Sequence, residues 1–389
     1  MTCYSIAACT AAVALSTAFA QSSPPQVLVT DYGTHTSIAR PGAPRHIVGL
    51  KRLDHRIVMD TGVREYGVRY LIAHDDKRPG VGIIGEGYIG MPQPADCNWY
   101  GGGFFDLQIN GKTIGTTPIH SLTAHRAGNR GQVDFVFDTA LSVVRIRFVT
   151  IADSDVLYCQ ALLEPKTEIK SLRVTLKCYP SAYITHFHRR VLTPVRDIAQ
   201  GERVDLDLAR EWWLLYYDRV VDAGHASATR TGVGPCSVLW PGSQATKVAF
   251  TVGGYGTRTA MDLKPQRRDF RFIFFDYAGT KNATAIADLR KRADGLLREL
   301  PTFPFTDQAI AKWPLAHKQR QIAQMLAKMP DEQAAAQYRE WAAKLGKLLK
   351  LVQSRAAGAI MAEAAVAGII QQWDKGLPEL RLKALLREF

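Results

Sequence analysis

Short apolar runs dominate the chain from about residue 27 to residue 277. They are rich in Val, Ile, Thr, Phe and Tyr, and Gly, Pro, Asn or Asp separates one run from the next. Within most runs apolar and polar side chains alternate, which is the period of a half-buried β-strand. Asn110 and Gly111 suit a type I′ turn and predict a hairpin over 104–115. The pattern predicts roughly sixteen to eighteen strands and no long helix before Asn282.

The run at 212–221 is apolar at nearly every position, so both of its faces are expected to be buried. Such a strand belongs at the centre of a two-layer sandwich. The chain shows no internal repeat of roughly 20–50 residues, which counts against a propeller or a solenoid. We therefore predict a mainly β fold, a large two-sheet antiparallel β-sandwich, followed by a C-terminal helical region.

The period becomes helical after residue 281. Apolar residues of 282–300 recur at three- and four-residue intervals, and a prolyl linker follows. A second helical stretch begins at Asp331, a good N-cap residue, with Gly346 and Gly358 as the expected kinks or breaks.

Two regions follow from this change of period. We predict a β-sandwich domain over 21–300 that ends in a helix, and an α-helical region over 301–389. Residues from about 305 onward are expected to be dispensable for folding, so that truncation near Thr302 leaves a soluble sandwich. The helices could pack on the sandwich, on a second copy of the chain or on a membrane surface.

The first twenty residues are small, apolar and uncharged, and Ala18, Phe19 and Ala20 fit a signal-peptidase site. They predict a signal peptide over 1–20 and a periplasmic or secreted protein. No segment has the length and the flanking charges of a transmembrane helix.

Four cysteines remain after such cleavage, and in an oxidising compartment they allow three pairings. Cys97 and Cys236 lie in Gly- and Pro-containing connections and are the favoured disulfide. Cys159 and Cys178 lie in strand-like apolar runs and are expected to be free core residues.

The chain carries 49 Lys and Arg against 36 Asp and Glu, a net charge of +13. This surplus is spread along the sequence and favours anionic partners such as uronic or sulfated glycans, or an anionic envelope surface. No basic stripe interleaved with aromatic residues appears, so nucleic acid is not an expected partner. The C-terminal helices could join a homo-oligomer.

His186 and His188 form the first candidate site, in the segment YITHFHRR. In a strand both imidazoles would share one face, which we expect to be the solvent-reached one. A metal would need a third ligand, so proton transfer, glycan contact or a solvated pair are the alternatives. Arg189 and Arg190, which follow, suit bidentate contacts to a carboxylate or sulfate.

The loop segment 85–106 is the second candidate site. Glu86 could act as a catalytic carboxylate, while Tyr88, Trp99 and Tyr100 could stack on sugar faces or simply cap the sandwich edge.

A calcium ion could use Asp153 and Asp155, although two acids at this spacing more often only form a turn. We expect no other metal and no cofactor, since no nucleotide-binding or hydrolase motif stands in a suitable context.

The strand count and size of residues 27–277 resemble the galactose-mutarotase-like β-supersandwich superfamily. The resemblance implies sugar chemistry, as in epimerases and in domains of glycan lyases and hydrolases. It rests on architecture without a motif match and assigns no catalytic residue here. The predicted function is a secreted carbohydrate-active enzyme (lyase, hydrolase or epimerase type) acting on an acidic glycan. The alternative is a non-catalytic glycan- or envelope-binding protein with a helical docking tail.

Overall fold

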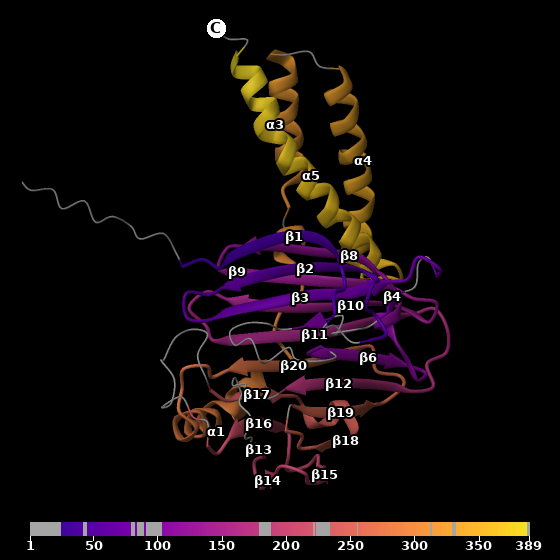
Figure 1. The fold of residues 1–389 in the computed structure, drawn as a ribbon. Helices are drawn as coiled ribbons and strands as arrows, with labels where there is room; N and C mark the ends of the chain where they lie inside the picture. Colours follow the sequence, from indigo (N-terminus) through magenta and orange to yellow (C-terminus); the bar gives the residue numbers. More distant parts are fainter. Residues whose placement is uncertain are drawn as a thin grey trace, which may run out of the picture.

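The computed structural model describes residues 25–41, 45–78, 82–83, 89–90, 103–178, 188–220, 222, 234–254, 256–311, 313–328 and 332–386. Within these ranges the chain forms three antiparallel sheets followed by helices, so the predicted mainly β fold with a helical C-terminal region is confirmed (Figure 1).

A nine-stranded sheet forms the central layer. In spatial order it contains β14 (Asp197–Ala199), β13 (Arg189–Leu192), β16 (Trp213–Asp218), β17 (Cys236–Leu239), β20 (Asp269–Asp276), β11 (Val156–Pro165), β10 (Ser142–Ile151), β9 (Arg130–Asp138) and β8 (Ile119–Ala127).

The opposite layer of the sandwich is divided into two sheets, where the sequence predicts one. The first contains β1 (Leu28–Ile38), β2 (Lys51–Asp60), β3 (Glu65–His74), β4 (Gly82–Ile83) and β5 (Ile89–Gly90). The second contains β15 (Arg203–Asp205), β18 (Ala245–Thr251), β19 (Thr257–Leu263), β12 (Leu172–Cys178), β6 (Phe105–Ile109) and β7 (Lys112–Thr113). Because β4 and β5 are only two residues long, no ladder joins these two sheets among the described residues.

One apolar core fills the space between the layers, and all three sheets contribute to it. The alternation predicted from the sequence orients it: on β10, Val144, Ile146 and Phe148 face inward. The predicted turn at the β6–β7 hairpin is confirmed, since Asn110 and Gly111 have φ values of 52° and 76°.

The outer face of the nine-stranded sheet is covered as well. Helix α1 (Asn282–Glu299) packs its apolar stripe on that face, and Phe303 and Phe305 of the following segment join the same cluster. The ring of Phe303 stacks on Tyr158, with centroids 3.7 Å apart. This cover explains why residues 212–221 lack a polar face. It also argues against the prediction that the sandwich folds without the chain after residue 300.

The remaining helices are α2 (Gln308–Ala311), α3 (Leu315–Lys328), α4 (Glu332–Ser354) and α5 (Ala359–Leu386). Helices α3, α4 and α5, here called the helical arm, project from the sandwich (Figure 1). Helix α3 lies in the predicted helical region, although the sequence pattern does not give its bounds. Gly346 lies inside α4, and the predicted break occurs only near Gly358, whose φ is +88°. None of the helices in the described ranges is long and apolar enough to cross a membrane.

Cys159 and Cys178 are free and fully buried, as predicted. Cys236 begins strand β17 instead of lying in a connection. Cys97 and the signal peptide over 1–20 lie outside the described residues, so the disulfide and the export of the protein stay predictions.

Candidate functional site

A row of polar side chains crosses the outer face of the nine-stranded sheet. Strand register places Thr123, Asp134, Arg147, Gln160 and Arg271 opposite one another on five adjacent strands, from β8 to β20. The residues before and after each of them pack against the inner core. The side chains of this row therefore point away from the inner core, while their neighbours in each strand point into it.

Arg147 is the centre of a buried ion network. Its side chain is fully buried, and its Nε and Nη2 each donate to a carboxylate oxygen of Asp134 at 2.6 Å. Nη2 also lies 3.0 Å from Glu363 Oε1 of α5, and Nη1 donates to the Phe305 carbonyl. Burial raises the pKa of Asp134, but the charge and hydrogen bonds of Arg147 outweigh it and hold this pKa below its ordinary value.

Glu363 fastens the helical arm to the sheet. Its second carboxylate oxygen pairs with Arg145, which also donates to Gln160 Oε1 at 3.2 Å. One carboxylate of α5 thus forms ion pairs with two guanidinium groups of β10. Buried charges of this kind are tolerated only when each has its partner.

His125 of β8 joins the segment before α2 to the same face. Its Nε2 lies 2.5 Å from Asp307 Oδ2. Burial lowers the pKa of His125, but the hydrogen bond and charge of Asp307, with the charge of Asp134, raise it overall. Burial acts to raise the pKa of Asp307, yet mainly His125, with Arg147, holds it at about 2.

Because the pKa of His125 is raised and that of Asp307 is lowered in the folded state, this pair stabilises the protein fully between the unfolded pKa of aspartate, roughly 3.9, and that of histidine, roughly 6.5. The stabilisation is lost as the pH rises through the folded-state pKa of His125. We expect the unfolding midpoint to fall across this range in the wild type and to vary less in the His125→Gln variant, measured by denaturant titration at each pH. His120→Gln, an exposed position on the same strand, is the control. Equal pH slopes for wild type and His125→Gln would contradict the assignment.

A cleft of about 580 Å³ opens beside the ion network. The outer sheet face, residues 301–306 and the α4–α5 junction line it, and its charged groups include Arg145, Arg147, Arg271 and Arg355. This volume lies within the usual range for small-molecule sites, about 300–1,000 Å³.

The carboxylates that line the cleft are already engaged. Asp269 pairs with Arg271 at 2.7 Å, and Glu363 pairs with the two guanidiniums of β10. Glu164 accepts the backbone N–H groups of Gly358 and Ile360 at 2.9 and 2.8 Å, so it caps the start of α5.

Arg355 differs from the other arginines of the cleft. Its side chain is exposed, and no carboxylate among the described residues pairs with it. Its φ is 52°, the left-handed region that glycine prefers at the end of a helix. Arg355 follows the last residue of α4, so an arginine stands where glycine would be the favourable residue. The cleft therefore has one accessible cation whose charge no described acid neutralises.

The described residues of the predicted YITHFHRR site, His188, Arg189 and Arg190, do not line this cleft. His188 is exposed just before β13, and its backbone N–H donates to Asp218 at 2.9 Å. Arg189 is buried beside Asp218, and Arg190 pairs with Asp197 at 2.8 Å. Strands β16 and β17 separate β13 from β20. Arg189 and Arg190 on β13 therefore lie about 14 Å across the sheet from β20, the nearest strand that lines the cleft.

His186, Glu86, Tyr88, Trp99 and Tyr100 lie outside the described residues. The described residues that flank their segments meet at one end of the sandwich. Lys177 donates its backbone N–H to Phe104, and Phe104 donates its own to Ile89. Across the layers, Tyr216 Oη lies 3.0 Å from Thr259 Oγ1, and Arg189 donates to the Gly254 carbonyl. The described residues on either side of the two predicted segments therefore lie at the same end of the sandwich.

Asp153 and Asp155 do not form a paired site. Asp153 occupies the turn before β11 with a φ of 58°, while Asp155 receives both Nη groups of Arg292 at 2.6 and 2.7 Å. Over the described ranges, no three His, Cys, Asp or Glu side chains gather as a metal site would require.

No known protein family matches the chain, and no curated protein is similar to it in sequence. Among solved structures it is similar to a chondroitinase AC lyase, with 7% identity, a TM-score of 0.37, and coverage of 61% of this chain and 38% of that one. It is similar to the alpha-N-acetylgalactosaminidase NagBb from Bifidobacterium bifidum, with 12% identity, a TM-score of 0.36, and coverage of 72% and 40%. A GH36 alpha-galactosidase, AgaA from Geobacillus stearothermophilus, gives 11% identity, a TM-score of 0.32, and coverage of 55% and 40%.

These neighbours are glycoside hydrolases and a lyase with β-rich folds. The chain spans about two fifths of the length of each. At these TM-scores the likeness assigns neither an activity nor a substrate to this chain.

The polar row and the cleft were not predicted from the sequence, although part of their pattern is visible in it. Arg145 and Arg147 alternate with apolar residues in a predicted strand, as do Gln132 and Asp134. A strand period places each pair on one face. What the sequence lacks is any sign that a helix more than 200 residues later covers that face.

Proposed function

We propose that the protein binds an acidic saccharide, uronic or sulfated, in the cleft between the nine-stranded sheet and the α4–α5 junction. The observation that carries the proposal is Arg355, an exposed guanidinium held in a left-handed backbone conformation without a partner carboxylate. A guanidinium binds a carboxylate or a sulfate bidentately. The apolar part of the lining, which includes Pro301, Pro304 and Val352, can contact the C–H faces of a sugar ring.

Charge and location agree with this ligand. The net charge of +13 favours polyanions, and an exported protein, as residues 1–20 predict, would meet acidic glycans outside the cytoplasm. The resemblance to the galactose-mutarotase-like superfamily adds a sugar-binding precedent by analogy.

Arg355→Gly provides the sharpest test, because it separates binding from stability. Glycine suits the left-handed conformation, so the variant should keep the wild-type unfolding midpoint while affinity for a sulfated or uronic oligosaccharide falls about tenfold. Calorimetric titration with a chondroitin sulfate tetrasaccharide and a galacturonate tetramer measures the affinity. A neutral maltotetraose and inorganic sulfate serve as ligand controls, and Arg203→Gly, an exposed position on β15, is the matched variant. Equal affinities of Arg355→Gly and wild type would refute the cleft.

The proposal also includes catalysis on the bound saccharide. His186 and His188 are proposed to transfer the proton, with Glu86 as the accompanying carboxylate and Tyr88, Trp99, Tyr100, Arg189 and Arg190 as substrate contacts. In the described structure Arg189 and Arg190 already pair with carboxylates, so a substrate anion would have to share them. The same saccharides should be screened for product formation, and binding without product would favour the non-catalytic alternative.

The arm supports a second candidate function, docking on an anionic envelope surface. Leu382, Leu385 and Leu386 at the C-terminal end of α5 are 57%, 55% and 66% exposed, next to Arg381. We expect sedimentation with vesicles rich in phosphatidylglycerol, reduced several-fold in a Leu382→Ser, Leu385→Ser variant and absent with phosphatidylcholine alone. If sedimentation is the same for the leucine variant as for the wild type, and the same with either lipid, docking of the arm on an anionic surface is contradicted.

A further inference from the structure

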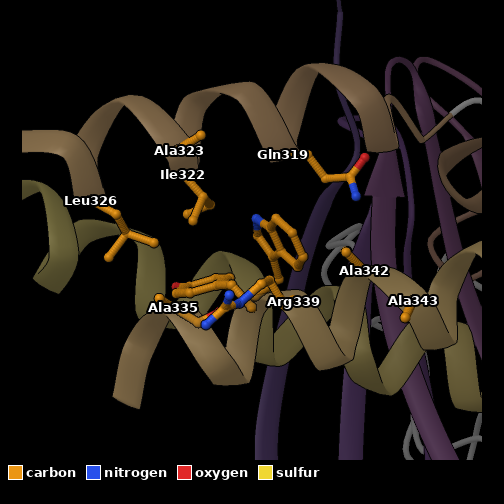
Figure 2. A pocket seen from close by; sticks show the side chains of 10 residues that line it. Gln319, Ile322, Ala323, Leu326, Ala335, Arg339, Ala342 and Ala343 are labelled. Atoms are coloured by element: carbon orange, nitrogen blue, oxygen red, sulfur yellow. The ribbon is translucent and has the colours of Figure 1, made fainter. Parts of the chain in front are cut away.

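The helical arm contains a second cavity, of about 450 Å³, between α3 and α4. Figure 2 shows Ile322, Ala323 and Leu326 of α3 on one wall, facing Ala335 and Ala342 across the space. Trp373 of α5 completes the lining. The cavity lies in the arm, apart from the arginine cleft on the sandwich.

Small side chains keep this cavity open. Four alanines line it: Ala342 is buried and Ala335 half-buried, while Ala323 and Ala343 are exposed at its rim. The space opens to solvent at these exposed residues, so a ligand can enter it, and burying apolar surface there is favourable. The cavity is therefore shaped for an apolar body that the described chain does not supply.

Trp373 adds a polar requirement. The side chain is 1% exposed, and the rings of Trp313, Tyr338 and Trp341 hold it, with centroids 5.4, 4.9 and 6.3 Å away. Its indole N–H has no acceptor among the described residues. Buried N–H donors without a partner are rare, and each one needs an explanation. An oxygen atom of a bound molecule would supply the missing acceptor.

Arg339 sets the charge of the occupant. It is the one charged residue of the lining and is exposed. Its Nε donates to the Ala335 carbonyl at 3.1 Å, which holds the guanidinium along α4 beside the cavity. No carboxylate of a described residue pairs with it. Gln319 of α3 contributes an exposed amide to the same lining (Figure 2). An anionic group with oxygen acceptors fits these donors.

We propose that this cavity binds a single-chain carboxylate amphiphile of the fatty-acid class. The alkyl chain lies between α3 and α4 against the alanines, Ile322 and Leu326, and the carboxylate accepts hydrogen bonds from Arg339 and the Trp373 indole. Binding fills the apolar space and satisfies the buried donor in one step.

Dodecanoate, below its micelle concentration, is the probe, with dodecanol as the uncharged comparison, in calorimetric titrations of the full-length protein. Ala335→Phe should fill the cavity and reduce the affinity for both probes at least tenfold. Ala336→Phe, at the exposed neighbouring position outside the lining, should leave both affinities unchanged.

Variants at two further residues, Arg339 and Trp373, address the polar head and remain informative if Ala335→Phe misfolds. Arg339→Ala should weaken dodecanoate about tenfold and leave dodecanol unchanged, and Arg339→Lys should restore part of the difference. Trp373→Phe keeps an aromatic side chain but removes the indole N–H, so it should weaken dodecanoate severalfold more than dodecanol, and the dodecanol titration accounts for the smaller ring.

Three results would overturn the proposal: no saturable dodecanoate binding, equal effects of Ala335→Phe and Ala336→Phe, or equal affinities for acid and alcohol in every variant. A protein that forms a dimer, and in which Ala335→Phe abolishes the dimer without any fatty-acid binding, would assign the groove to a second copy. The saccharide cleft is independent of this outcome, because Arg355 contributes to neither wall.

Discussion

Replacing Asp134 by alanine should destabilise the protein by about 3–5 kcal/mol, the cost of leaving a buried charge without its partner. Arg147 is fully buried and gives Asp134 both of its short hydrogen bonds, so the truncation leaves Glu363 as its nearest carboxylate. Urea unfolding followed by circular dichroism measures the change. The matched control is Asp138→Ala, which breaks the ion pair with Lys166, where both side chains are 42% exposed. That change should cost less than about 1 kcal/mol.

A double variant tests whether the instability comes from the unpaired charge of Arg147 alone. Replacing Asp134 by leucine together with Arg147 by methionine removes both charges while filling the space. We expect this double variant to be more stable than Asp134→Ala alone. If the double variant is as unstable as the single one, the network is needed for more than mutual neutralisation. An Asp134→Ala protein as stable as the Asp138→Ala control would show that Arg147 is not buried as described.

Ending the chain at Thr302 should abolish cooperative folding of the sandwich. The truncation removes Phe303 and Phe305, which cover the outer sheet face, and Glu363, which neutralises Arg145 and Arg147. Losing one buried phenylalanine alone typically costs about 3–5 kcal/mol, and whole domains are stable by only about 5–15 kcal/mol. We expect aggregation, or dye binding with a broad melting transition.

Intermediate truncations give the control series. A chain that ends at Ala311 keeps the two phenylalanines and the His125–Asp307 pair, so it should retain more order than the chain that ends at Thr302. A chain that ends at Leu386 keeps every described contact and should melt as the full-length protein does. A soluble, cooperatively melting product from the Thr302 truncation would restore the sequence-based view of an independent sandwich.

Both the Asp134→Ala change and the truncation at Thr302 disturb the outer face of the nine-stranded sheet. The outer face of the nine-stranded sheet is a second interior, apolar under α1 and ionic under α5. The saccharide cleft lies where this ionic part reaches solvent. Its arginines are positioned by the same contacts that fasten the arm, so binding in the cleft and docking of α5 are expected to be coupled.

Local rules determined much of this protein from its sequence. Alternation of apolar and polar residues located most strands, and the positive-φ preference of Asn110 and Gly111 located the β6–β7 hairpin. Helical spacing located α1 and α4. Such features depend on residues a few positions apart, which is why a single sequence reveals them.

Tertiary structure alone decided which groups meet. Arg145 and Arg147 face outward by the strand period, but their partner Glu363 comes from a helix 218 and 216 residues further along. The division of the second layer into two sheets and the position of Arg355 beside the cleft depend likewise on long-range packing. A strand period can place a side chain on a face. Only the docking of distant elements, driven by the burial of apolar surface and the pairing of the charges buried with it, decides what covers that face.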